Sequence, residues 1–348
     1  MKPAKTSFLQ FHHPEPYRLR NPIWPVFLPF TGCPFQCIFC SQNSQTGQKS
    51  IPLKQSIENM VSGINTRYEK TGKPVSLGFF GGTFTAMPIK DMMIILNQAE
   101  KLKNAGLVDH IRCSTRPDCV TTDRLEILKS MKVDMIELGI QSFDDQTLKF
   151  SHRGYTRDKA VQACEGVKKA GFDLGIQLMG GLPGSGHGTF FKDIDTISKI
   201  VPKIVRLYPC LVLKGTPLEK VMNQEQYRPW GLNRTFHTLA MALLKLWSKK
   251  ISVIRIGLTP EKSLIRNILA GPWHPAMGSI CKSMALKNYF TAQLAKTKYS
   301  PDKILIPKKY ISDLWGHKGM NREFFAQKKI NRQNVEVWNR DYFRIYFK

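Results

Sequence analysis

Short apolar runs alternate along the chain with longer stretches in which apolar residues recur every three or four positions. The apolar runs are rich in Val, Ile, Leu and Phe and are bounded by Gly, Pro or Asp, a pattern typical of buried strands. They cover residues 21–28, 75–80, 108–114, 133–140, 172–179 and 203–209. The amphipathic stretches between them cover residues 56–70, 90–106, 122–131, 156–171 and 190–201. Strands alternating with helices of this length predict βαβ units and a parallel sheet.

About six such units predict an α/β fold, a full or partial parallel (β/α) barrel. Functional residues of such barrels lie where a strand ends and the next loop begins. After residue 230 the pattern changes, first to a long helix and a strand, then from about residue 302 to a small α+β region. We therefore expect an N-terminal extension 1–19, a barrel 20–258, a connecting segment 259–301 and a C-terminal region 302–348.

Three of the eight cysteines, Cys33, Cys37 and Cys40, follow directly on the first predicted strand. Three thiolates this close together favour a soft metal centre. Structural zinc is the alternative, but it normally needs four ligands in two pairs, and no second pair at zinc spacing occurs. Iron–sulfur clusters usually take four cysteines, so three on one loop would leave one iron open, as catalysis requires. The spacing favours a catalytic cluster over zinc.

The net charge is the unusual bulk property, with 52 Lys and Arg against 26 Asp and Glu, a formal +26. Such a field attracts polyanions, chiefly nucleic acid or anionic membrane, although general basicity or solubility is an alternative explanation. There is no run of about 18 apolar residues, so a membrane span is not expected. The N-terminus lacks an apolar signal segment, and we expect a cytoplasmic protein.

The CxxxCxxC spacing, with Phe39 before the last cysteine, resembles the signature of the radical S-adenosylmethionine (SAM) enzymes. In that superfamily the three cysteines hold a 4Fe–4S cluster whose open iron binds the amino and carboxylate groups of SAM. One electron then cleaves SAM to methionine and a 5′-deoxyadenosyl radical, which abstracts a hydrogen atom from the substrate. The resemblance implies both cofactors and an electron donor such as flavodoxin or ferredoxin.

Further motifs follow the other predicted strands in the expected order. Gly81, Gly82 and Thr83 resemble the loop that meets the SAM amino group, where glycines permit close backbone approach. The sequences STRPD, GIQS, HRGY and GLPG resemble the branch that contains the Elongator catalytic subunit and oxygen-independent coproporphyrinogen oxidase. This resemblance implies contacts to the SAM ribose and carboxylate from Gln141, Ser142, Arg153 and Gln177.

Two departures from the Elongator pattern limit what the resemblance implies. Ser114 stands where that pattern has a glutamate that contacts the ribose. No acetyltransferase domain is expected after the barrel, so the use of acetyl-CoA is not implied. Cys210, at the end of the sixth strand, is a candidate hydrogen-atom donor or covalent nucleophile, with a packed small side chain as the alternative.

The C-terminal region contains GHKG between two predicted helices, flanked by predicted strands. This order resembles the core of a KH domain, in which such a loop clamps a single-stranded nucleic-acid backbone. The resemblance implies nucleic-acid contacts from Gly316, His317, Lys318 and Gly319. The alternative is a small basic cap on the barrel.

Three functions are compatible with these features. The first is a radical SAM enzyme that modifies a tRNA or rRNA nucleotide, which the charge and the GHKG tail favour. The second is a radical SAM enzyme acting on a small anionic metabolite such as a porphyrin precursor. The third is a non-catalytic iron–sulfur protein that binds RNA.

Overall fold

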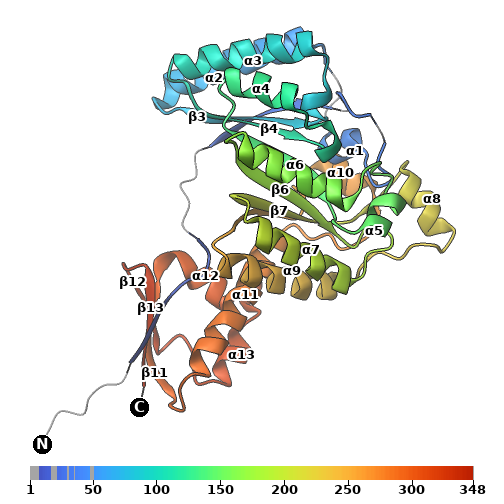
Figure 1. Ribbon diagram of the computed structural model, residues 1–348. Coiled ribbons are helices and arrows are strands. Elements are labelled where there is room, and N and C mark those ends of the chain that lie inside the picture. Colours follow the sequence, from blue (N-terminus) through green and yellow to red (C-terminus); the bar gives the residue numbers. More distant parts are fainter. Residues whose placement is uncertain (1–7, 17–21, 30, 35, 48–50, 348) are drawn as a thin grey trace, which may run out of the picture.

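A computed structural model of the chain describes residues 8–16, 22–29, 31–34, 36–47 and 51–347. Its main sheet contains seven strands, each parallel to its neighbours, and curls into a half barrel (Figure 1). In spatial order the strands are β2 (Ile23–Leu28), β3 (Val75–Gly81), β4 (Val108–Thr115), β5 (Met135–Gln141), β6 (Asp173–Gly180), β7 (Ile204–Pro209) and β9 (Ser252–Ile256). The predicted partial (β/α) barrel is confirmed.

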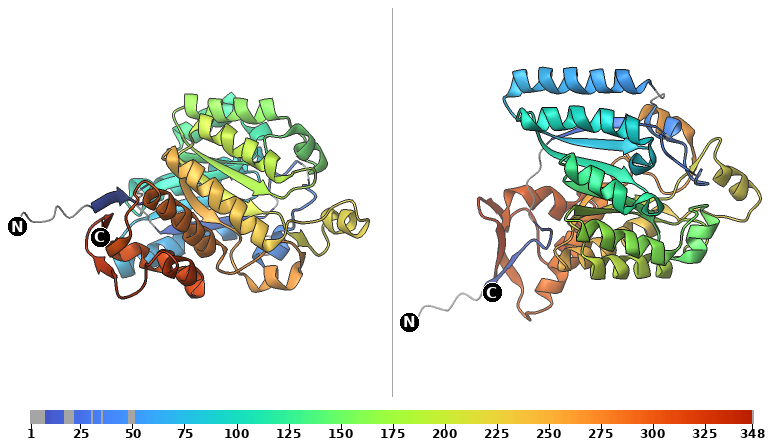
Figure 2. Two further views of the ribbon diagram at one scale, coloured as in Figure 1. Left: turned by 90° about the horizontal axis from the view of Figure 1, so that it is seen from below. Right: turned by 45° about the horizontal axis from the view of Figure 1, so that its top comes forward.

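The long helices cover the convex face of the half barrel (Figures 1 and 2). They are α2 (Leu53–Thr71), α3 (Ile89–Asn104), α4 (Thr122–Ser130), α6 (Arg157–Lys169), α7 (His187–Ile200) and α9 (Leu232–Ser248). Two of them begin at threonine caps, since the hydroxyls of Thr121 and Thr156 accept from the amides of Arg124 and Lys159. The buried sides of these helices and the strands form one continuous core.

Shorter elements occupy the loops that follow the strands. They are α1 (Gln42–Thr46), η1 (Phe84–Ala86), η2 (Pro117–Cys119), α5 (Asp145–Phe150), α8 (Pro217–Asn223) and α10 (Lys262–Asn267). A two-stranded antiparallel sheet of β8 (Val212–Leu213) and β10 (Ile268–Ala270) lies among them. No helix among the described residues is long and apolar enough to cross a membrane.

A second sheet joins the two ends of the chain. Its strand order is β1 (Phe8–His12), β13 (Tyr342–Phe347), β11 (Pro301–Pro307) and β12 (Val335–Trp338). Part of the predicted N-terminal extension 1–19 is thus an edge strand of the C-terminal α+β region. Residues 1–7 and 17–19 of that extension lie outside the described residues.

One helix belongs to both cores. The first half of α11 (Met277–Leu294) packs in the barrel core through Ile280 and Met284, whereas Leu286 and Phe290 lie in the core of the second sheet. The short elements η3 (Lys308–Tyr310), α12 (Ile311–Trp315), η4 (His317–Gly319) and α13 (Arg322–Ala326) complete that second core. The predicted connecting segment 259–301 therefore contains the helix that joins the two parts.

Phe11 tests the contribution of the N-terminal strand. Its buried ring stacks on Phe343 with 5.0 Å between ring centres and meets Phe290 edge-on at 5.5 Å. We expect Phe11→Ala to lower the free energy of unfolding by about 3–5 kcal/mol, measured by urea denaturation. Phe8→Ala is the matched control, because Phe8 is 54% exposed. Equal losses in the two variants would contradict this packing.

Candidate active site

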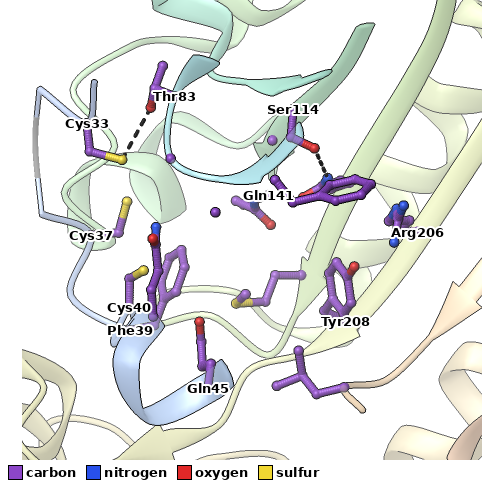
Figure 3. A pocket seen from close by; sticks show the side chains of 18 of the residues that line it. Cys33, Cys37, Phe39, Cys40, Gln45, Thr83, Ser114, Gln141, Arg206 and Tyr208 are labelled. Carbon is purple, nitrogen blue, oxygen red and sulfur yellow. Dashed lines mark hydrogen bonds between the residues drawn. The ribbon is translucent and has the colours of Figure 1, made fainter. Parts of the chain in front are cut away.

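A cavity of about 620 Å³ opens at the carboxyl edge of the half barrel, and its walls come from every strand of the main sheet or the loop that follows it. Figure 3 shows the three cysteine sulfurs on one side of it and Ser114, Arg206 and Tyr208 on the other. Parallel strands end at one edge of a sheet, and this brings together residues that are far apart in the sequence.

Cys33, Cys37 and Cys40 line the cavity from the loop after β2. The Cys33 sulfur lies 3.4 Å from the Thr83 hydroxyl. Burial and then the thiols of Cys37 and Cys33 raise the pKa of Cys40 to about 12. Thiolates gathered in this way need a positively charged partner, which a metal centre provides.

Zinc and a four-iron cluster place different demands on three cysteine ligands. Zinc–sulfur bonds of about 2.3 Å would draw thiolates together around one ion. Among the described residues, no three His, Cys, Asp or Glu side chains are placed to hold a single metal ion. In a four-iron cluster each cysteine binds a different iron, so the sulfurs do not have to converge on one point.

Two arginines surround the buried thiol of Cys37. Arg153 donates from Nη1 to the Cys37 sulfur at 2.9 Å and from Nε to the Tyr155 hydroxyl at 3.0 Å. Arg116 lies 3.8 Å from the same sulfur and is fixed by a bidentate pair with Asp118, at 2.9 and 2.8 Å. Both guanidinium groups are buried and donate towards the Cys37 sulfur.

The glycines after β3 let two loops approach each other closely. A Cβ on Gly82 would lie 2.1 Å from the Thr31 carbonyl oxygen and 2.8 Å from that of Leu28. Gly81 has a φ of 102°, in the region that favours glycine. The backbone between β2 and the cysteines therefore rests directly on this turn.

A buried ion network forms the floor of the cavity. Glu137 of β5 is fully buried and accepts from Arg206 Nε at 2.7 Å, and from Arg112 Nη1 at 3.1 Å. Burial alone would raise the pKa of Glu137, but Arg206 and Arg112 outweigh it and lower the pKa. Gln177 continues the network, with its amide nitrogen 3.4 Å from Glu137 and 3.3 Å from the Ser114 hydroxyl.

Gln141 projects into the cavity from a strained turn at the end of β5. Its φ is 71°, and its buried amide oxygen has no hydrogen-bond partner among the described residues. Asp193 of α7 supports this turn, because its carboxylate accepts from the Ser142 hydroxyl at 2.8 Å and from the Phe143 amide at 2.7 Å. Ser142 is fully buried in this contact.

The cavity brings together most of the predicted site residues. Those that line it are Cys33, Cys37, Phe39, Cys40, Gly81, Gly82, Thr83, Ser114, Gln141, Arg153 and Gln177. Three predicted features do not line it. Ser142 supports Gln141 from behind, Cys210 is buried in an apolar cluster next to Tyr227, and GHKG lies beside α11.

Sequence analysis missed the floor residues Arg112, Glu137 and Arg206, and also Tyr208 and Arg255 on the cavity wall. Glu137 and Arg206 are each a charged residue inside a largely apolar strand, whereas the strand of Arg112 also contains Asp109 and His110. Such a charge is stable in a buried strand only if it is paired. That pattern was the available signal, but it does not reveal which strands supply the partners.

Comparison with known proteins identifies the class of this fold and site. Residues 27–197 match the family model described as the radical SAM superfamily, and residues 202–285 match the model described as the radical SAM C-terminal domain. The chain belongs to the radical SAM superfamily, whose enzymes use a 4Fe–4S cluster and SAM. These are its cofactors.

Two curated relatives illustrate the branch. A tRNA uridine(34) acetyltransferase of Methanocaldococcus infernus is 27% identical over 249 residues, 60% of this chain and 47% of that protein. The oxygen-independent coproporphyrinogen-III oxidase-like protein HemZ of Bacillus subtilis is 22% identical over 268 residues, 73% of this chain and 52% of that protein. The chain thus spans about half the length of these relatives. The predicted Elongator and coproporphyrinogen oxidase branch is confirmed.

Among solved structures, the archaeal Methanocaldococcus infernus Elp3 with an N-terminal deletion has the same fold. Its TM-score is 0.62 at 19% identity, and the match covers 77% of this chain and 64% of that one.

The residues present fit the two cofactors. Three cysteines on one loop could provide the thiolate ligands, and the Gly81–Gly82 turn packs directly against the backbone that leads into that loop. The unpartnered amide oxygen of Gln141 offers an acceptor for a bound polar group. These features lie on the wall of one cavity.

A variant at Gly82 tests the contact between the glycine turn after β3 and the loop after β2. We expect Gly82→Ala to displace the cysteine loop, since the added Cβ would overlap the Thr31 carbonyl, and to lower the iron bound after anaerobic reconstitution severalfold. Iron and acid-labile sulfide assays measure this. Gly188→Ala is the matched control, because nothing lies within 4 Å of a Cβ there. Iron content at the control level would contradict the close approach.

A variant at Asp193 tests whether its carboxylate supports the turn that presents Gln141. Burial raises the pKa of Asp193 to about 7, although the Phe143 amide and Ser142 hydroxyl lower it. The folded protein therefore holds this proton more tightly than the unfolded chain, and the contribution of Asp193 to stability falls as pH rises from about 4 to about 7.

We expect the free energy of unfolding of Asp193→Asn, relative to wild type, to rise by about 2 kcal/mol or more between pH 5 and pH 8, measured by urea denaturation. Asp195→Asn is the control, since Asp195 lies on the same helix and is half exposed. A difference that does not change with pH would refute the shifted ionisation.

Proposed function

We propose that the chain is a radical SAM enzyme that modifies a nucleotide of RNA. The observation that carries the radical chemistry is the cavity with three cysteines on one wall and polar side chains from four further strand ends on the others. When bound, the cluster and SAM supply a one-electron cleavage that yields a 5′-deoxyadenosyl radical. An electron donor such as flavodoxin or ferredoxin is part of the proposal.

The chain's own residues bind and orient the reactants. Cys33, Cys37 and Cys40 would hold the cluster, and Arg116 and Arg153 donate towards the Cys37 sulfur. Gln141 accepts a hydrogen bond from bound SAM through its amide oxygen.

Ser114 and Gln177 complete the polar floor and would offer hydrogen bonds to the SAM ribose. Glu137 fixes that floor through its ion pairs but stays below the cavity surface.

A nucleotide substrate has to enter the cavity while the rest of the RNA stays outside. Among the described strands, β2 and β9 end the main sheet without pairing to each other. Ile23 of β2 lines the cavity and is 42% exposed, which supports access from this side. The net charge of +26 favours a phosphate backbone outside the cavity. A relative named for action on tRNA uridine supports the same substrate class.

Most arginines of the cavity favour RNA over a small polycarboxylate. Three of the four that line the cavity are held by an acidic or thiol group of the protein, and the fourth, Arg255, contacts a hydroxyl. Arg116 is held by Asp118, Arg153 by Cys37, Arg206 by Glu137 and Arg255 by the Thr259 hydroxyl. A porphyrin precursor would need guanidinium groups able to grip its carboxylates.

The radical chemistry is tested with reconstituted protein, SAM and dithionite. We expect 5′-deoxyadenosine, detected by liquid chromatography, from the wild type and none from Cys37→Ala. Cys164→Ala is the matched control, since Cys164 is buried in α6 outside the cavity, and it should retain the activity. No product from the wild type would exclude both enzymatic functions and leave the non-catalytic RNA-binding one.

The RNA substrate is tested by mass spectrometry of nucleosides in RNA from cells with and without the gene. We expect one modified nucleoside to be missing without the gene and restored by the wild-type gene, but not by Cys37→Ala. An unchanged profile would favour the small-metabolite function.

A further inference from the structure

The second sheet has one face on its core and the other, among the described residues, uncovered. Along β13 the side chains of Phe343 and Ile345 are buried, and Tyr342, Arg344 and Tyr346 point to the opposite face. Helices α11, α12 and α13 lie on the buried side (Figure 1). By strand register, the outer face consists of Phe8, Gln10, His12, Lys303, Leu305, Glu336, Trp338, Tyr342, Arg344 and Tyr346.

Arg344 lies at the centre of this outer face, surrounded by rings. Its guanidinium carbon is 4.9 Å from the centre of the Phe8 ring, 5.4 Å from that of Tyr342 and 5.5 Å from that of Trp338. Its hydrogen-bond partners are neutral: Gln10 Oε1 at 3.0 Å and, more weakly, the hydroxyls of Tyr342 and Tyr346. Its Nε has no partner among the described residues.

The acidic side chains at this face are already matched by basic ones. Glu336 pairs with Lys303 at 2.9 Å, and Asp341 lies 3.7 Å from His12. Among the described residues of the outer face, Arg344 is therefore the one basic side chain without a carboxylate partner. Its Nε is buried, so an anionic oxygen would approach the Nη nitrogens.

The rings offer two separate stacking positions. Phe8 and Tyr346 pair across the strands at one end, with 6.2 Å between their centres, and Trp338 and Tyr342 meet at 4.7 Å at the other. Tyr342 and Tyr346 are four residues apart on one strand, which separates the two positions by about 13 Å. Phe8 is 54% exposed.

We propose that this outer face is a binding platform for single-stranded RNA. Bases stack on the two ring pairs, and Arg344 between them binds a phosphate or stacks on a base. The net charge of +26 supports a polyanionic occupant over a second protein surface. The inference rests on the proposed RNA substrate and specifies where a part of that RNA away from the reacting nucleotide is held.

The GHKG loop is a weaker candidate for this role. The amides of Gly319 and Met320 donate within the turn, to Gly316 and His317. Its neighbour Asn321 is buried, donating to the carbonyl oxygens of Leu314 and Ser283. These groups are used to fix the turn on α11.

The test measures binding of fluorescent single-stranded oligouridylate, and of duplex RNA of the same length, by anisotropy at several salt concentrations. We expect Phe8→Ala/Tyr346→Ala to weaken single-strand binding at least about tenfold, with little effect on the duplex. Arg344→Gln should weaken it too and reduce the salt slope by about one. Tyr68→Ala, an exposed tyrosine on α2, is the matched control and should bind like the wild type.

The other outcomes would contradict the proposal that the outer face binds RNA. If Phe8→Ala/Tyr346→Ala binds like the wild type and Lys318→Ala does not, the GHKG loop is the RNA site instead. If the double variant changes the oligomeric state in light scattering without changing RNA affinity, the outer face is a protein interface. In both cases a gene-dependent nucleoside would leave the proposed function standing. No RNA binding by the wild type, with an unchanged nucleoside profile, would overturn both.

Discussion

The buried ion network of Glu137 with Arg112 and Arg206 is the interaction on which the site depends. A closed barrel is usually filled by layers of branched apolar side chains. Here the inner face carries charged and amide side chains, which are stable because they satisfy one another across four neighbouring strands. A polar inner face cannot collapse into an apolar core, so a cavity remains at the carboxyl edge.

The parallel arrangement converts this cavity into a site. The cysteine loop follows β2, the glycine turn ends β3, and Ser114, Gln141 and Gln177 lie at or near the ends of β4, β5 and β6. The backbone pairing of each strand with its neighbour positions these groups relative to one another. The geometry of the site therefore depends on the register of the whole sheet. Asp193 adds a second support from a covering helix, holding the turn that presents Gln141.

The candidate site residues other than the cysteines were mostly implied by a family resemblance. Local patterns predicted the fold and the cysteine centre, because buried strands, amphipathic helices and the cysteine spacing are properties of short segments. What they could not provide were partners distant in sequence. Nothing near Phe8 to His12 indicates that they pair with Tyr342 to Phe347. Likewise Ser142 and Cys210 follow strands as site residues do, but the side-chain direction at a strand end depends on tertiary packing, and neither lines the cavity.

We propose that the cysteine loop holds a cluster with a position open to SAM inside this polar cavity. Electron paramagnetic resonance of the dithionite-reduced, reconstituted protein tests this most directly. We expect a 4Fe–4S signal whose g values change when SAM is added, because SAM would bind the cluster itself. A signal that SAM leaves unchanged, or stoichiometric zinc without a cluster signal, would contradict it.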